Sequence, residues 1–121
     1  ARQGSNGSPG GDKLNKKQLR QRRSHIIAER ARLLKPLERQ MAESEDKIDH
    51  NEKKIGELNQ EMLAVSQAGG GANIAKISKE IHRYQEEIDA QFETLERLSL
   101  AHEEKSVEFD KQLETLDKAG H

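Results

Sequence analysis

The sequence predicts an all-α fold: a two-helix antiparallel coiled-coil hairpin preceded by a basic N-terminal helix. The composition is the first indication, because 31 % of the 121 residues are hydrophobic, 36 % are charged and only three are aromatic. A coiled coil needs few large apolar side chains, since each helix buries a single seam. The second indication is an apolar repeat in alternating steps of three and four, and the third is a glycine-rich break that divides this repeat into two arms.

Residues 1–12 are expected to be a flexible linker, because Gly and Ser dominate them. Residues 13–35 are predicted to form a basic helix, since residues 13–34 contain no Gly or Pro and are rich in helix-forming residues. Pro36 lacks a backbone donor and clashes with the preceding turn, which predicts a kink or a helix boundary at about residues 34–36. The apolar stripe of the basic helix comprises Leu19, Ile26, Ile27, Leu33 and Leu34.

Residues 36–118 are predicted to form the hairpin, with its turn at residues 66–73. Three glycines in the turn allow a sharp reversal, and Asn73 is a plausible N-cap for the second helix. The seam of the first arm is predicted at Leu34, Leu37, Met41, Ser44, Ile48, Asn51, Ile55, Leu58, Met62 and Val65. The seam of the second arm is predicted at Ile74, Ile77, Ile81, Tyr84, Ile88, Gln91, Leu95, Leu98, His102, Ser106, Phe109, Leu113 and Leu116.

Two details of the seam stand out. A buried polar residue such as Asn51 fixes the register of a coiled coil at a cost in stability. Near His102 the repeat takes an extra step of four, a stutter that locally unwinds a supercoil. An antiparallel pairing places Val65 near Ile74 and Leu34 near Ser106, so apolar positions meet along most of the seam. This match favours a hairpin within one chain, and we expect a monomer.

The net charge of −1 conceals an uneven distribution. Residues 13–39 hold ten basic and two acidic residues, whereas residues 40–121 hold ten basic and nineteen acidic ones. Such a basic segment points to an anionic partner, and cations on one helical face can contact successive phosphates. A solvated, helix-favouring linker is the competing interpretation. The candidate nucleic-acid-binding residues are Lys13, Lys16, Lys17, Arg20, Arg22, Arg23, Arg30, Arg32, Lys35 and Arg39.

Other classes of function find little support in the sequence. The absence of Cys excludes disulfides and thiol chemistry. The five His are scattered without metal-ligand spacing, and the paired carboxylates lie on helix faces with no pocket-forming core. We therefore expect no catalytic residue, no metal and no cofactor in this chain. No apolar run approaches the roughly 18 residues of a membrane span, and a cytoplasmic location without a membrane is the default expectation.

The order of elements is similar to that of a known family. A Lys/Arg-rich helix containing Lys16-Lys17-Gln18-Leu19-Arg20-Gln21-Arg22-Arg23 is followed by Leu34-Lys35-Pro36-Leu37-Glu38, a heptad arm, a short turn and an acidic second arm. From about Lys13 to Leu116 this resembles the C-terminal coiled-coil domain of ABC-F ATPases of the Uup and YheS types. The turn departs from the family, since it is Gly-rich where many members carry a Leu-Tyr pair near the second arm.

The resemblance implies that two ATP-binding domains precede this chain in a cytosolic protein, that the chain itself has no ATPase activity, and that DNA or ribosomal RNA is its partner. We therefore expect a non-catalytic nucleic-acid-binding C-terminal domain of a soluble ABC-F ATP-binding protein. The alternative is a protein-interaction or spacer coiled coil without nucleic-acid binding. An enzyme is disfavoured, because the sequence shows neither a pocket-forming core nor a nucleophile–base pair.

Overall fold

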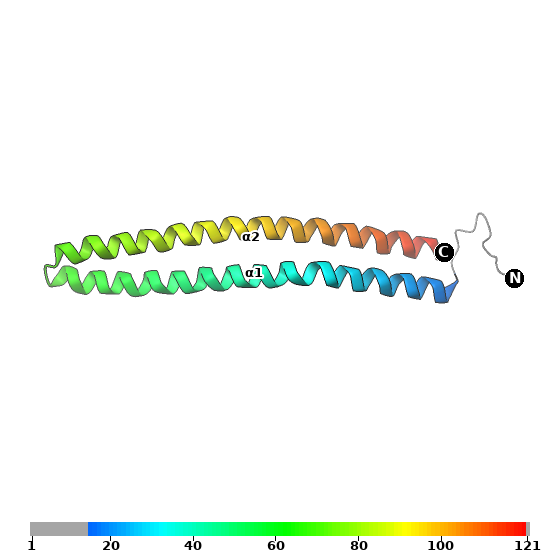
Figure 1. The fold of residues 1–121 in the computed structure, drawn as a ribbon, viewed down its shortest axis with the longest axis horizontal. Coiled ribbons are helices and arrows are strands. Elements are labelled where there is room, and N and C mark those ends of the chain that lie inside the picture. The colour runs from blue at the N-terminus through cyan, green and yellow to red at the C-terminus, as the bar shows by residue number, and fades with distance from the viewer. Residues whose placement is uncertain (1–14, 121) are drawn as a thin grey trace. The chain divides into compact units, whose positions relative to one another are not determined.

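The computed structural model describes residues 15–120, which form two helices and no strand. Helix α1 comprises Lys16–Gln67 and helix α2 comprises Gly71–Ala119. The two helices pack against each other as a hairpin, which confirms the predicted fold class (Figure 1). Within the described residues, neither helix has a stretch that is long and apolar enough to cross a membrane. The predicted linker at residues 1–12 lies outside the described residues.

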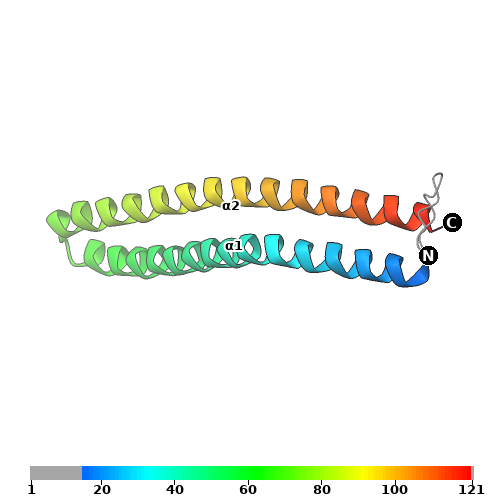
Figure 2. The ribbon, with the colours of Figure 1, turned by 45° about the vertical axis from the view of Figure 1, so that its right-hand side comes forward.

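The chain comprises two compact units. Unit 1 contains the described residues 15–37 and 101–120, and unit 2 contains residues 38–100. In each unit, a stretch of α1 lies antiparallel beside a stretch of α2 (Figure 1 and Figure 2). Unit 1 carries eleven basic and seven acidic side chains in its described residues, a net charge of +4. Unit 2 carries eight basic and fourteen acidic side chains, a net charge of −6.

Helix α1 continues through Pro36, so of the two alternatives predicted at residues 34–36, a kink or a helix boundary, the boundary is wrong. The kink stays a prediction. From Lys16 on, the basic helix expected over residues 13–35 is therefore the first part of α1 and not a separate element. Residues 13 and 14 lie outside the described residues. A proline inside a helix forfeits one backbone hydrogen bond and costs about 3 kcal/mol. Leu34, which is 4 % exposed, and the half-buried Leu37 flank Pro36 on the seam, and their burial offsets this cost.

The seam predicted from the heptad repeat is confirmed. Every predicted seam position of both arms is buried or half-buried. The most deeply buried apolar side chains are Leu34, Ile48, Ile77, Phe109 and Leu116. Two polar side chains, Ser44 and Asn51, are also buried, with 4 % and 6 % of their surfaces exposed. The repeat in steps of three and four thus identifies the side of each helix that faces the other.

The register of unit 1 also agrees with the predicted pairing. Ion pairs join Arg23 to Asp117 and Arg30 to Asp110, so a step of seven along α1 is matched by seven in the opposite direction along α2. A further step of four along each helix reaches Leu34 and Ser106, which is the pair predicted from the sequence. This agreement supports the antiparallel register derived from the apolar repeat.

The turn between the helices is a Schellman motif built on glycine. The Gly70 N–H donates to the Val65 carbonyl at 3.0 Å, and the Gly69 N–H donates to the Ser66 carbonyl at 3.2 Å. Gly69 has a φ of +79°, the left-handed conformation that this motif requires. A Cβ on Gly70 would lie 2.8 Å from Val65 Cγ1, so the close approach of the chain also selects glycine.

The start of α2 differs from the prediction that Asn73 is its N-cap. The backbone N–H groups of Asn73 and Ile74 both donate to the Gly70 carbonyl at 3.1 Å, so Gly70 occupies the N-cap position and Asn73 lies in the first turn. Helix α1 extends to Gln67 and α2 begins at Gly71, so the turn is shorter than the predicted residues 66–73. Gly70 thus has two roles: its N–H belongs to the Schellman motif that ends α1, and its carbonyl occupies the N-cap position of α2.

The buried Asn51 gives a prediction about stability. We expect Asn51→Leu to raise the free energy of unfolding by about 1 kcal/mol, because an apolar side chain replaces a polar one on the seam. Asn59→Leu on the exposed side of α1 is the matched control and should change stability by less than about 0.5 kcal/mol. Urea unfolding followed by circular dichroism measures both changes. A destabilised Asn51→Leu variant would show that the Asn51 amide stabilises the fold.

Candidate nucleic-acid interface

The candidate basic residues begin at the first turn of α1. Asn15 caps this helix: its Oδ1 accepts a hydrogen bond from the Gln18 N–H at 2.8 Å, and Gln18 Oε1 accepts one from the Asn15 N–H at 3.2 Å. This reciprocal pair is a capping box, which defines where the helix starts. Lys16 and Lys17 are therefore the first two helical residues. Lys13, also predicted as a binding residue, lies outside the described residues.

The positive charge at this helix start opposes the helix dipole. The N-terminus of a helix carries a partial positive charge, so acidic residues stabilise it and basic residues destabilise it. The first turn of α1 contains no acidic residue, and Lys16, Lys17 and Arg20 occupy its first two turns. The dipole therefore gives no reason to place cations there. An anion bound at this position would be favoured by the side chains and the dipole together.

Two of the predicted cations are engaged by α2. Arg23 Nη1 donates to Asp117 Oδ1 at 3.0 Å, and Arg30 Nη2 lies 3.6 Å from Asp110 Oδ1. All four side chains are between 39 % and 64 % exposed, so solvent weakens both pairs to about 1 kcal/mol or less. These arginines already have carboxylate partners within unit 1, which the other predicted cations of unit 1, apart from Arg32, lack.

A third cation, Arg32, is engaged within α1. Its Nε and Nη2 donate to the two carboxylate oxygens of Glu29 at 3.1 and 2.8 Å. These hydrogen bonds hold the pKa of the Glu29 carboxyl below its ordinary value. The stabilisation from this pair is therefore present above the ordinary pKa of Glu29 and is lost as pH falls through the lowered value.

The remaining predicted cations are exposed and form no ion pair within residues 15–120. Five of them belong to unit 1, whereas Arg39 belongs to unit 2. Arg39 is therefore not part of the interface described for unit 1. Among the unpaired cations of unit 1, we call the five that the sequence predicted the basic surface: Lys16, Lys17, Arg20, Arg22 and Lys35.

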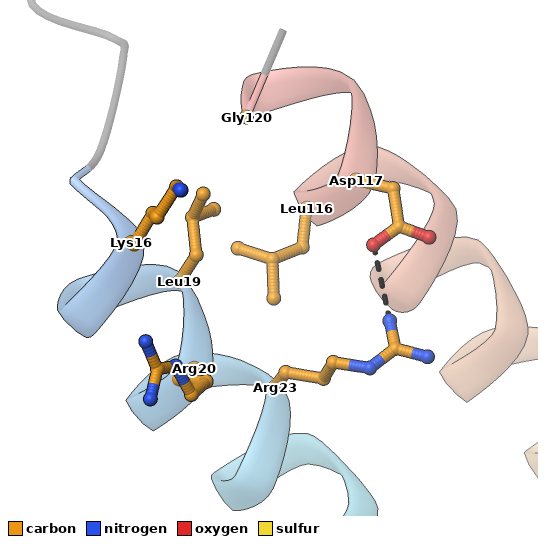
Figure 3. Close-up of a pocket in the computed structure, with 7 residues that line it drawn as sticks. All are labelled: Lys16, Leu19, Arg20, Arg23, Leu116, Asp117 and Gly120. Carbon is orange, nitrogen blue, oxygen red and sulfur yellow. Dashed lines mark hydrogen bonds and ion pairs between the residues drawn. The ribbon is translucent and has the colours of Figure 1, made fainter.

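A hollow of about 410 Å³ lies beside the basic surface in unit 1. Figure 3 shows Leu19 and Leu116 facing each other across it, with Lys16 and Arg20 on one side and Arg23 reaching Asp117 on the other. Gly120 completes the lining, and a Cβ there would lie 2.9 Å from Leu19 Cδ1. The hollow thus has an apolar floor beneath a basic rim.

The seam of unit 1 differs from the sequence prediction at Ile27 and Arg30. Ile27 was expected on the apolar stripe but is 48 % exposed, and the half-buried Arg30 occupies the seam instead. From Ile26 the seam takes two steps of four, to Arg30 and to Leu34, so α1 contains a stutter of its own. The Nε of Arg30 is the one buried side-chain polar atom without a hydrogen bond that the structure gives for the described residues. The sequence shows these two successive steps of four residues only if a polar residue, Arg30, is allowed on the seam.

The described part of the chain forms no candidate metal site. Residues 15–120 contain no group of three His, Asp or Glu side chains close enough to hold a metal ion. Comparison with known proteins adds no assignment, because no protein-family model, curated protein or solved structure matches the chain.

Proposed function

We propose that this chain is a non-catalytic nucleic-acid-binding domain, in which the basic surface of unit 1 contacts phosphates of DNA or ribosomal RNA. The observation that carries this proposal is the group of unpaired cations at the start of α1, where no acidic residue offsets them. Lysine and arginine side chains neutralise phosphates and release counterions, which gives affinity without sequence preference. Residues 15–37, which carry these cations, contain no Phe, Tyr or Trp, so base stacking would contribute little.

The resemblance to the C-terminal domain of ABC-F ATPases supports the same proposal. In that setting, the chain would be a cytoplasmic appendage of a protein with two ATP-binding domains on its N-terminal side. The hairpin would carry the basic surface as an arm, and the ATPase domains would supply the catalytic activity. The coding sequence upstream of residue 1 tests this part, because an ABC signature motif followed by a Walker B motif is expected there.

The direct test is the salt dependence of binding. We expect the chain to bind duplex DNA or RNA at low salt, with affinity falling by a factor of about 10² to 10³ between 50 and 200 mM salt if about five phosphates are contacted. Fluorescence anisotropy with labelled duplexes of unrelated sequence measures this and should give similar affinities for all of them. Undetectable binding even at about 50 mM salt would exclude the proposal.

A second candidate function is supported by the charge of the rest of the chain. Unit 2 has a net charge of −6, and two arginines of unit 1 are already paired with aspartates of α2. These features favour a protein-interaction or spacer coiled coil whose cations serve the fold. The salt experiment separates the two candidates, since a spacer would leave labelled nucleic acid free at every salt concentration.

A further inference from the structure

Unit 2 exposes an unusual combination of side chains on α2. Phe92 and Leu100 are 50 % and 54 % exposed, and they lie eight residues apart, with Glu96 midway between them. Residues spaced by four lie on the same side of a helix, so these three side chains form one stripe. Asp89, three residues before Phe92, and Glu93, three residues before Glu96, extend it. We call these five residues the acidic stripe.

The acidic stripe lacks a partner within the described chain. None of its three carboxylates forms an ion pair with any residue of 15–120. Residues 86–100 hold five acidic and one basic side chain, a net charge of −4. Apolar side chains spaced along a charged helix face are typical of a surface that receives another helix. The stripe fits a helix face that combines basic and apolar side chains.

Such a face is present on unit 1 of the same sequence. Lys16, Arg20, Ile27 and Ala31 follow one another on α1 at steps of four, seven and four, so they share a side of the helix. Ile27 is 48 % exposed, and Lys16 and Arg20 form no ion pair within residues 15–120. We call these four residues the basic stripe. It is complementary to the acidic stripe, because its charge is opposite and because it also exposes an apolar side chain.

We propose that a second copy of this chain occupies the acidic stripe, with the basic stripe of one copy packed against the acidic stripe of the other. In a two-fold dimer this contact occurs twice, because each copy offers both surfaces. Ile27 of one copy lies beside Phe92 and Leu100 of its partner, and Lys16 and Arg20 meet the carboxylates of the acidic stripe. The opposite net charges of units 1 and 2 favour this arrangement. An association of unit 1 with unit 1 and of unit 2 with unit 2 would place like charges together.

The dimer departs from the monomer expected from the sequence, and it goes beyond nucleic-acid binding. Lys16 and Arg20 belong to both the basic surface and the basic stripe. Phosphates and the carboxylates of the second copy therefore compete for the same cations. Added duplex nucleic acid is expected to shift the chain from dimer to monomer.

Charge reversal in separate chains tests the pairing. Arg20→Glu and Asp89→Arg are each expected to weaken dimerisation by at least about tenfold, because each places like charges in contact. With Ile27 between Phe92 and Leu100, Arg20 lies opposite Asp89, since both are seven residues towards the N-terminus from that point. A mixture of the two variants should dimerise again, since one contact then joins the two substituted side chains, which carry opposite charges, and the other contact is unchanged. Sedimentation equilibrium at low salt measures all three samples. A mixture that stays monomeric, or a native chain with a dimer dissociation constant weaker than about 1 mM, would overturn the proposal.

The apolar part of the contact has its own test. The double variant Phe92→Ser/Leu100→Ser is expected to weaken the dimer by at least about tenfold while circular dichroism retains the helical spectrum. Leu63→Ser is the matched control, because Leu63 is 62 % exposed and lies outside both stripes. An equal loss of dimer in both variants, or no loss in the double variant, contradicts the assignment of the interface to the acidic stripe.

Discussion

Replacement of Phe109 by alanine is expected to destabilise unit 1 by about 3 kcal/mol. Phe109 is 6 % exposed, and it lies on the seam position that follows Ser106. Removal of its ring forfeits the free energy of transfer from water and leaves a cavity that two packed helices cannot fully close. Unfolding in urea, followed by circular dichroism and by hydrogen exchange of amides in unit 1, measures the loss.

The chain offers a matched control for this prediction. Phe92 is on the same helix, but it is 50 % exposed and lies outside the seam. We expect Phe92→Ala to change the free energy of unfolding of the monomer by less than about 0.5 kcal/mol. Comparable destabilisation by both substitutions would mean that the seam does not distinguish the two rings, which would contradict the register described above.

Removal of three cations from the basic surface is expected to have the second large effect. The triple variant Lys16→Ala/Lys17→Ala/Arg20→Ala should bind duplex nucleic acid at least about tenfold more weakly at low salt, and the slope of log K against log salt should fall by about three. Alanine is a good helix former and relieves the unfavourable charges at the helix start, so the fold should be retained. Anisotropy titrations at several salt concentrations measure both quantities.

A control with the same change in net charge separates a local interface from a general electrostatic effect. Lys53, Lys76 and Lys79 are exposed cations of unit 2 without ion pairs in residues 15–120. Their triple replacement by alanine should reduce the affinity much less than replacement of the basic surface. Equal losses would indicate that nucleic acid responds to net charge alone and would remove the basis for an interface on unit 1.

The seam could be predicted from the sequence because its signal is regular. Apolar residues at alternating steps of three and four define a side of a helix without knowledge of its partner. Even the polar Ser44 and Asn51 could be placed on the seam, because their neighbours on each side keep the spacing. The position of the glycine turn could also be predicted, since Gly69 and Gly70 each meet a conformational or steric demand that other residues meet poorly. Its bounds and its N-cap could not.

The sequence was a poorer guide where two principles compete. Pro36 predicts a kink or a helix boundary, but α1 does not end there, because the burial of its seam neighbours outweighs the lost hydrogen bond. That balance depends on a partner helix. Hydrophobicity alone places Ile27 on the apolar stripe, although its side chain is 48 % exposed. The stutter instead brings Arg30 to the seam, where its aliphatic stem packs and its guanidinium reaches Asp110.

The charge pattern of the sequence locates the candidate interface, but it does not show which of its cations lack an ion pair. The clustering of basic residues in 13–39 identified the region, yet it could not separate Arg23 and Arg30, which contact aspartates of α2, from the cations of the basic surface, which do not. That separation requires the antiparallel register, because Asp117 lies 94 residues from Arg23 along the chain. Nucleic-acid binding itself stays a prediction.

The capped start of α1 has a consequence for dynamics. Asn15 and Gln18 close a box of hydrogen bonds around a turn whose lysines repel one another and oppose the dipole. This turn therefore opens at a lower free energy than the middle of the helix. An anion that neutralises the lysines lowers the population of the opened turn by mass action. If the basic surface binds phosphates as proposed, slower amide exchange from Lys17 to Arg20 is the expected record of its occupancy.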